Sequence, residues 1–448
     1  MIKYCKGIKK SLKKHFKGFD HLEELLGLLP ESLPHAKLSK WGREQKKDRS
    51  KDRIGAHLGS ANKTLRISIA YAKANNPQFI LKSELKKGHA FGIHERAFVD
   101  CLVRKIAGVV GALSESQSDQ LLIKSSDVAD LAIGEFLRKT SNIEGVDFPQ
   151  VIKYLKALAQ QSYETKPITY GILVLPRKER KKAVAKFPSD ILDQKRFQAL
   201  TDGYKTGLLV DRTGKIVQLI SLSSSEATGK HFRPLWLDPI SESARSRNGL
   251  GIALTRTGAI LISWQGNLLL SYRLGKWILW HHSENVELIK KGLRRKGPKP
   301  KGIERLAAKL YRVALDISFR RTGGLLVALH SPKDIHKLVG APEQINGKRR
   351  TAGDRTIGEW LTANTMAGTK RELLCDLAAL DGAVVCDRKG RILSYGSVLL
   401  LPKRKGLSRI EGSRSRAAHS ASFFGLSIKI SSDGEMKVIK DGGVLLAI

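Results

Sequence analysis

The chain is poor in cysteine, in aromatic residues and in acidic residues. Its 448 residues include four cysteines, 6% aromatic residues, and 42 Asp or Glu against 80 Lys or Arg. No two cysteines are spaced as Cys-x-x-Cys, which argues against a disulfide scaffold or a zinc finger and favours a reducing compartment. No run approaches the roughly 18 apolar residues that a spanning helix needs. No apolar signal-peptide core follows the basic N-terminus, so we expect a cytoplasmic protein without a membrane span.

The shortage of acidic residues leaves a net charge of +38, while hydrophobic residues still make up 41% of the chain. That apolar content excludes wholesale disorder. The charge predicts an anionic partner such as a nucleic acid, a nucleotide or a lipid headgroup. Seven lysines in the first seventeen residues carry part of it, at positions 3, 6, 9, 10, 13, 14 and 17. Such runs are most often solvated, and contact with nucleic acid or an acidic partner is the alternative.

The length predicts two or three domains. We expect a basic N-terminal region at 1–60, a mostly helical segment at 61–164, a β-rich α/β domain at 165–288, a basic Gly/Pro linker at 289–302 and an α/β domain at 303–448. In the β-rich part, Arg212-Thr213-Gly214 and Arg256-Thr257-Gly258 each separate two apolar runs, which predicts hairpins. His281-His282 beside Glu284 lacks further ligands at metal-site spacing, so we predict a structural role for the pair.

The last 146 residues alternate helical and strand patterns. A helix is expected over 303–320, helical periodicity over 357–380, and a short helix from 412. Strands are expected at 325–329, 384–386, 392–395, 398–401, 426–430 and 436–439. Together they predict an α/β fold with a mixed sheet and flanking helices.

Two places in this domain suggest chemistry. Asp381-Gly382-Ala383 sets a carboxylate beside a glycine at the start of a strand, which suits a metal or a hydroxyl, or forms an ordinary turn. Gly412 to Ala418, with Arg414 and Arg416, sets a glycine, hydroxyls and two arginines at the start of a helix. Backbone N–H groups and guanidinium groups favour phosphate there, and a serine N-cap with surface arginines is the alternative.

Taken in order, four segments resemble those of the diadenylate cyclase family. Arg321 to Leu325 resembles its RTGALIV segment, and Leu380 to Val385 resembles its HDGAVII segment. Ile392 to Leu401 is similar to the strand that follows, and Gly412 to Ala418 resembles its GTRHRAA segment. The resemblance covers 303–448. It implies condensation of two ATP into cyclic di-AMP and two pyrophosphates, with Mg²⁺ or Mn²⁺, in a face-to-face homo-oligomer regulated by an N-terminal sensor region.

The resemblance also implies roles for individual residues. It assigns catalysis to Asp381, Arg414 and Arg416, and the metal to Asp381. It assigns nucleotide binding to Arg321, Thr322, Gly382, Ala383, Gly412, Ser413 and Ser415.

Three positions depart from the family pattern. Ser415 and Leu380 each replace a histidine, and Ser432 replaces a glutamate of a Ser-Glu-Glu run. A serine cannot replace an imidazole as a metal ligand or proton carrier near neutral pH. A nucleotide-binding sensor without catalysis is therefore one alternative function. A basic nucleic-acid-binding protein is the other, and the net charge of +38 motivates it.

Overall fold

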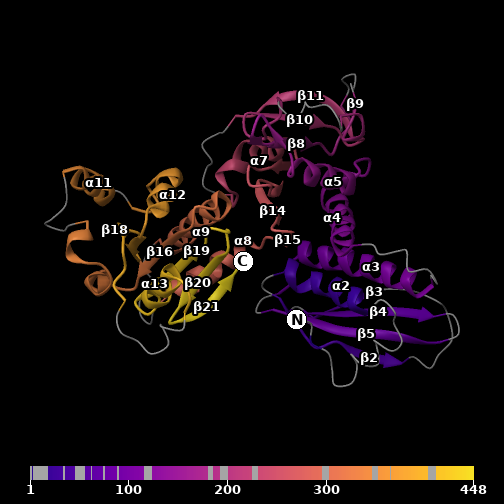
Figure 1. The fold of residues 1–448 in the computed structure, drawn as a ribbon, viewed down its shortest axis with the longest axis horizontal. Helices are drawn as coiled ribbons and strands as arrows, with labels where there is room; N and C mark the ends of the chain where they lie inside the picture. The colour runs from indigo at the N-terminus through magenta and orange to yellow at the C-terminus, as the bar shows by residue number, and fades with distance from the viewer. Residues whose placement is uncertain are drawn as a thin grey trace. The chain divides into compact units, whose positions relative to one another are not determined.

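The computed structural model describes two compact units (Figure 1). Unit 1 contains residues 1–231 and 236–280, and unit 2 contains 232–235 and 281–448. The described residues are 3, 19–33, 36–45, 56–61, 63–73, 76–87, 90–115, 124–179, 185–191, 200–223, 231–294, 302–345, 352–363, 365–401 and 410–448. Most of the predicted basic N-terminal stretch and the middle of the predicted linker lie outside them. The division falls after Trp280, before the helix His282–Leu293, which includes the first residues of the predicted linker.

Unit 1 begins with a helix and a five-stranded antiparallel sheet. The helix is α2 (Phe19–Ser32), and the strands are β1 (Lys37–Leu38), β2 (Gly42–Gln45), β3 (Ala56–Ala61), β4 (Thr64–Lys73) and β5 (Asn76–Lys86). The prediction of a helical segment is wrong over β4 and β5. Leu65, Ile67 and Ile69 are buried and alternate with more exposed residues, which is the period of a strand with one face on the core.

The helical prediction is confirmed further along unit 1. Its helices are α3 (Ile93–Glu115), α4 (Ser125–Ser141) and α5 (Phe148–Leu158). Asp147 caps α5, because its carboxylate accepts a hydrogen bond from the backbone N–H of Gln150 at 3.0 Å. The helices α4 and α5 therefore form where apolar residues recur at intervals of three and four.

The β-rich part of unit 1 is an eight-stranded mixed sheet in the order β15-β14-β13-β12-β8-β10-β11-β9. Its strands are β8 (Tyr170–Val174), β9 (Ala185–Lys186), β10 (Thr206–Val210), β11 (Lys215–Ser221), β12 (Leu250–Leu254), β13 (Ile260–Trp264), β14 (Asn267–Arg273) and β15 (Lys276–Leu279). Both predicted hairpins are confirmed as the antiparallel pairs β10–β11 and β12–β13. In the first turn, the Asp211 carboxylate accepts hydrogen bonds from the backbone N–H groups of Thr213 at 2.9 Å and Lys215 at 3.1 Å. The helix α7 (Asp238–Arg245) packs against β8, β12 and β13. The strands β6 (Ser162–Tyr163) and β7 (Lys166–Pro167) form a separate two-stranded sheet.

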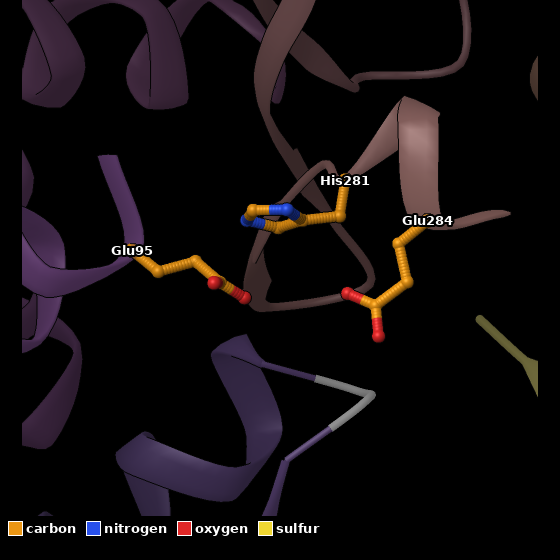
Figure 2. A group of neighbouring side chains, drawn as sticks. All are labelled: Glu95, His281 and Glu284. Carbon is orange, nitrogen blue, oxygen red and sulfur yellow. The ribbon is translucent and has the colours of Figure 1, made fainter. Parts of the chain in front are cut away.

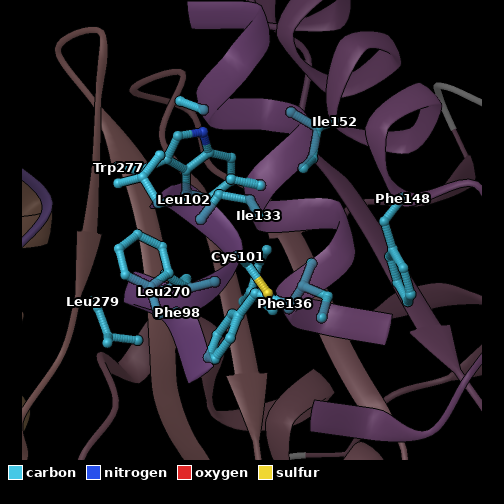
Figure 3. Packing of buried hydrophobic residues seen from close by; sticks show 14 of the residues in the cluster. Phe98, Cys101, Leu102, Ile133, Phe136, Phe148, Ile152, Leu270, Trp277 and Leu279 are labelled. Carbon is cyan, nitrogen blue, oxygen red and sulfur yellow. The ribbon is translucent and has the colours of Figure 1, made fainter. Parts of the chain in front are cut away.

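One hydrophobic core joins the helices of unit 1 to the eight-stranded sheet (Figure 3). Phe98 of α3 and Phe136 of α4 meet edge to face with ring centroids 5.5 Å apart. Leu270 and Trp277 bring β14 and β15 into the same cluster. Cys101 is buried between the helices, and burial raises the pKa of its thiol to about 11. The cysteine is therefore a packing residue.

Unit 2 is a six-stranded mixed sheet in the order β18-β17-β16-β19-β20-β21. Its strands are β16 (Gly324–Leu329), β17 (Ala383–Asp387), β18 (Ile392–Ser397), β19 (Gly425–Ile430), β20 (Met436–Lys440) and β21 (Gly443–Ala447). Its helices are α8 (His282–Leu293), α9 (Ile303–Arg320), α10 (Ile335–Leu338), α11 (Ala352–Ala363), α12 (Arg371–Ala379) and α13 (Ser413–Ala421). The predicted α/β fold, with a C-terminal mixed sheet flanked by helices, is confirmed.

Unit 2 departs from the sequence prediction in three details. Residues 398–401 are not a strand, because β18 ends at Ser397, and Leu399 alone packs inward while Val398 and Leu400 are exposed. The helical stretch at 357–380 is split into α11 and α12 by a turn in which Gly368 N–H donates to the Thr365 carbonyl at 3.0 Å. The third difference is an additional strand, β21. Hydrophobic content alone does not distinguish a packed loop from a paired strand.

A buried ion pair ties α9 to α12. The Asp316 carboxylate accepts two hydrogen bonds from Arg371, from Nη2 at 2.7 Å and from Nε at 2.9 Å. It accepts a third from the backbone N–H of Leu235 at 2.8 Å. The Asp316 side chain is fully buried and that of Arg371 is 10% exposed. Each oxygen of the Asp316 carboxylate therefore accepts at least one hydrogen bond, which compensates for the water that a buried anion loses.

Candidate nucleotide site

The sheet of unit 2 gathers the predicted site segments at one of its ends. β16 and β17 are parallel and in register, so the loops that lead into them lie side by side. β19 is antiparallel to β16, and Gly324 at the start of β16 pairs with Ile430 at the end of β19. We call this end, where the loops 321–323, 380–382 and 431–435 meet, the motif end of the sheet.

Arg321, Thr322 and Gly323 connect α9 to β16. Arg321 takes a left-handed conformation with φ 57°, and its N–H donates to the Ile317 carbonyl at 3.0 Å, which ends the helix. Gly323 follows with φ +71°, and a Cβ there would lie 2.5 Å from Nη1 of Arg414. The guanidinium of Arg414 therefore lies directly against the Gly323 backbone, which joins two of the segments that the sequence analysis singled out.

Asp381 and Gly382 connect α12 to β17. Gly382 has φ +138°, and a Cβ there would lie 2.4 Å from the carbonyl carbon of Gly396 and 2.5 Å from the Ser397 nitrogen. Only glycine fits at this position, because any side chain would collide with the backbone of β18. Asp381 itself is exposed, and Ala383 is 1% exposed within β17. The loop is thus fixed by packing while it presents the Asp381 carboxylate to solvent.

The first turn of α13 contributes the other predicted residues. Gly412 is the N-cap with φ 81°, and its carbonyl accepts a hydrogen bond from Arg416 N–H at 3.1 Å. A serine N-cap is therefore wrong, because Ser413 is the first residue inside the helix. Ser413 is exposed, whereas Arg414, Ser415 and Arg416 are half-buried. Within the described part of the chain, Nε of Arg416 is buried and has no hydrogen-bond partner.

Guanidinium groups at the motif end can hold an anion. Arg321, Arg414 and Arg416 bring three of them to the loops and to the first turn of α13, while Asp381, Asp433 and Glu435 bring carboxylates. A phosphate group offers the acceptor oxygens that helix N–H groups and guanidinium groups bind best.

Asp433 is a residue at the motif end to which the sequence analysis gave no role. It lies in the turn between β19 and β20, where its carboxylate accepts hydrogen bonds from the Ser431 hydroxyl and from Glu435 N–H at 3.1 Å. The Ser431 hydroxyl, followed by the Glu435 N–H, lowers the pKa of Asp433. The sequence did draw attention to this turn, because the neighbouring Ser432 replaces a glutamate of the Ser-Glu-Glu run that the resemblance leads one to expect.

The Asp381 carboxylate suits a divalent cation that takes most of its other ligands from phosphate groups and water. Among the described residues, no group of three acidic, histidine or cysteine side chains surrounds Asp381. A single carboxylate cannot hold a divalent ion by itself. Mg²⁺, however, is commonly bound by one or two carboxylates together with substrate phosphates and water.

His281, His282 and Glu284 lie at the start of α8, and Figure 2 shows His281 and Glu284. His281 is the N-cap of the helix, and Glu284 lies in its first turn. His282 has a structural role, as predicted, because its Nδ1 is 2.9 Å from the Tyr311 hydroxyl and its ring stacks on Phe232. Within unit 2, His281 and Glu284 are two ligands where zinc takes three or four from protein, so we assign no metal site to them.

Glu95, also labelled in Figure 2, belongs to α3 of unit 1. Its buried carboxylate accepts hydrogen bonds from Lys87 Nζ at 2.7 Å and from Gly92 N–H at 2.8 Å. The ion pair with Lys87 has both side chains only 2% exposed. Glu95 therefore stabilises the connection between β5 and α3.

Comparisons with known proteins place few constraints on the chain. No family model and no curated protein matches it. One partial structural match is a hypothetical membrane spanning protein from Bacillus cereus, 19% identical, with a TM-score of 0.25 over 34% of this chain and 66% of that one. The chain thus spans just under two thirds of that protein's length. Another is a double mutant of DacA from Staphylococcus aureus, 22% identical, with a TM-score of 0.23 over 32% of this chain and 87% of that one. Both TM-scores are below 0.5, which is too low to establish a shared fold.

In the part of the chain that the structure covers, no helix combines the length and the apolar character that crossing a bilayer requires.

Proposed function

We propose that unit 2 is a diadenylate cyclase that binds ATP at the motif end of its sheet and condenses two ATP into cyclic di-AMP with release of two pyrophosphates. The observation that carries the proposal is the contact of the Arg414 guanidinium with Gly323. It brings the first turn of α13 to the same sheet end as the loop that presents Asp381. Phosphate-binding groups and a carboxylate thereby flank one region of the surface.

Each residue has a role in this proposal. Arg414 and Arg416, with the N–H groups of the first turn of α13, hold the phosphates through charge-assisted hydrogen bonds. Gly382 lines the ribose, and Asp381 accepts the proton of the 3′-hydroxyl at a carboxylate oxygen. Ala383, which the resemblance also assigned to the nucleotide, is 1% exposed and supports the loop from within β17. The bond from the 3′-oxygen to the α-phosphorus forms as the bond to the departing pyrophosphate breaks. A divalent cation bound with ATP supplies charge neutralisation at the phosphates.

The reaction requires two nucleotides that face each other, so the proposal includes a homo-oligomer of at least two protomers. Specific activity then rises with protein concentration as protomers associate. Unit 1 is proposed as the regulatory part. A cytoplasmic location is also part of the proposal, because the buried Cys101, Cys375 and Cys386 are free thiols and ATP is the substrate.

A product assay on the full chain tests the proposal. Purified protein is incubated with ATP and Mn²⁺ or Mg²⁺, and cyclic di-AMP is measured by mass spectrometry. We expect product from the natural sequence and none above background from Asp381→Asn. The matched control is Asp441→Asn, which alters an exposed aspartate in the turn between β20 and β21, at the opposite end of the sheet. Product that persists in Asp381→Asn would contradict the assigned site.

A nucleotide-binding sensor without catalysis is the second candidate function. Ser415 favours it, because this half-buried residue of α13 stands where the resemblance leads one to expect a histidine. Saturable ATP binding without product would support this function, and Ser415→His would then be expected to introduce measurable cyclisation. The lysines of the first seventeen residues, which would contact nucleic acid, lie outside the described residues except for Lys3. Nucleic-acid binding by these lysines therefore stays a prediction.

A further inference from the structure

The five-stranded sheet of unit 1 has one face on the hydrophobic core and one face toward solvent. Leu65 and Ile67 of β4 are 1% and 0% exposed and belong to the same core as α3, which packs against this strand (Figure 1). Arg66 and Ser68 alternate with them and are more exposed. Because successive side chains of a strand point to opposite sides, Arg66 and Ser68 lie on the solvent face.

The strand pairing extends this solvent face over β1, β4 and β5. Residues directly opposite each other in an antiparallel pair share a face. β5 pairs with β4 on one side and with β1 on the other, which places four exposed cations on the solvent face: Lys37, Arg66, Lys82 and Lys86. We call this surface the basic sheet face.

The segment that contains the sheet is richer in positive charge than the chain as a whole. Residues 36–90 include 14 Lys or Arg and four Asp or Glu, a net charge of +10, which is about twice the share expected from +38 over 448 residues. Among the described side chains of the basic sheet face, Glu84 is the one carboxylate, and it is shared by Lys86 at 2.8 Å and Arg66 at 3.4 Å. The face therefore carries an excess of positive charge.

Two of the cations lie opposite each other across neighbouring strands. Lys37 of β1 is paired in register with Lys86 of β5, which sets their Cβ atoms about 4.5–5.5 Å apart. Lys37 is exposed, and the Lys86 side chain is 57% exposed. Like charges directly opposite each other destabilise a sheet. A bound anion relieves this repulsion, so the lysine pair favours an anionic partner.

The chemistry of the basic sheet face favours the backbone of a nucleic acid over a lipid surface. Lys82 and Lys86 are four residues apart in one strand, or about 13 Å, whereas the phosphates of a duplex strand follow one another at a rise of about 3.4 Å. The hydroxyls of Ser68, opposite Lys82, and Thr64, opposite Lys86, are further donors for phosphate oxygens. The described side chains of the face include no large apolar residue to insert into a bilayer or stack on a base.

We propose that the basic sheet face binds the phosphate backbone of a nucleic-acid duplex without reading its sequence. The proposal concerns unit 1 and stands independently of the cyclase function of unit 2. It gives the net charge of the chain a binding surface within the folded protein.

Fluorescence anisotropy of the full chain with a labelled DNA duplex of mixed sequence tests the proposal, at salt concentrations from about 50 to 200 mM. Affinity should fall steeply with salt. The double variant Lys37→Gln with Lys86→Gln loses two phosphate contacts, so the slope of log K against log salt should become shallower by about two. Over this range the natural sequence should then lose roughly tenfold more affinity than the double variant.

The matched control is Lys153→Gln with Lys166→Gln, which removes two exposed lysines elsewhere in unit 1, from α5 and β7. This control should keep the slope of the natural sequence, and circular dichroism confirms that both double variants are folded. Vesicles of phosphatidylcholine and phosphatidylserine in equal parts measure binding to a lipid surface. Absence of duplex binding by the natural sequence at the lowest salt, or an equal change of slope in the two double variants, would overturn the proposal. Loss of vesicle binding with an unchanged duplex slope in Lys37→Gln with Lys86→Gln would overturn it in favour of a lipid surface.

Discussion

Replacing Gly323 with alanine tests whether the position of Arg414 matters for nucleotide binding. The new Cβ would lie 2.5 Å from Nη1 of Arg414, well inside contact distance. Nη1 is the far end of a flexible side chain, so the guanidinium can move aside at little cost to the fold. The φ of +71° adds about 1–2 kcal/mol of strain for any residue with a Cβ.

Gly302 provides the matched control. It has φ +87° and precedes α9 in the same unit, but a Cβ there would meet no atom within 4 Å. Gly302→Ala therefore introduces the same backbone strain without touching Arg414. The free energy of unfolding should fall by about 1–2 kcal/mol in both variants, as measured by urea denaturation.

Nucleotide affinity separates the two variants. Displacing Arg414 removes charge-assisted hydrogen bonds that contribute about 1.5–3 kcal/mol, so ATP should bind Gly323→Ala roughly ten- to a hundredfold more weakly. Gly302→Ala should bind ATP as the natural sequence does. Calorimetric titration with ATP measures both. Equal affinities in the two alanine variants would show that Arg414 does not contact the nucleotide.

Two other predictions concern stability. Asp316→Asn leaves the buried guanidinium of Arg371 without its counter-charge, so urea denaturation should show the transition of unit 2 destabilised by about 3–5 kcal/mol. The double change Asp316→Leu with Arg371→Met should recover much of that loss, and a single variant as stable as the natural sequence would refute the reasoning. Burial raises the pKa of Asp211, but the hydrogen bonds from Thr213 and neighbouring N–H groups outweigh it and leave the pKa below its ordinary value. Asp211 therefore stabilises unit 1 above its ordinary unfolded pKa of about 4, and this contribution is lost as the pH falls through the lower folded value. In Asp211→Ala that part of the acid dependence should disappear from pH-dependent thermal unfolding.

The sequence predicted the parts of the fold that local pattern determines. Amphipathic α9, the hairpins around Gly214 and Gly258, and the buried strands of unit 2 appear where their periodicity places them. The helical prediction is wrong at β4 although Leu65, Ile67 and Ile69 alternate there with Arg66 and Ser68, which is the period of a strand. The segment 398–401 is hydrophobic, but it is not a strand because β18 ends at Ser397. Whether a segment pairs as a strand depends on the strands beside it, which its own sequence does not specify.

The candidate site was predictable as a set of segments but not as a geometry. The segments at 321–325, 380–385 and 412–418 were identified from the sequence, whereas the positive φ of Gly323, Gly382 and Gly412 is a property of the folded chain. Gly323 and Arg414 lie far apart in the sequence, and the order of strands in the sheet brings them into contact.

The strand order of unit 2 also bears on how the protein is made. β16 lies between β17 and β19, and the ribosome completes β16 before it has synthesised either neighbour. One edge of β16 can pair once β17 is complete at Asp387, but its other edge stays unpaired until β19 is complete at Ile430. Non-local pairing of this kind slows folding and exposes apolar segments in the meantime. In unit 1, β8 likewise waits for its neighbour β12, but the last strand of that unit ends at Leu279, so unit 1 can fold while unit 2 is still being translated.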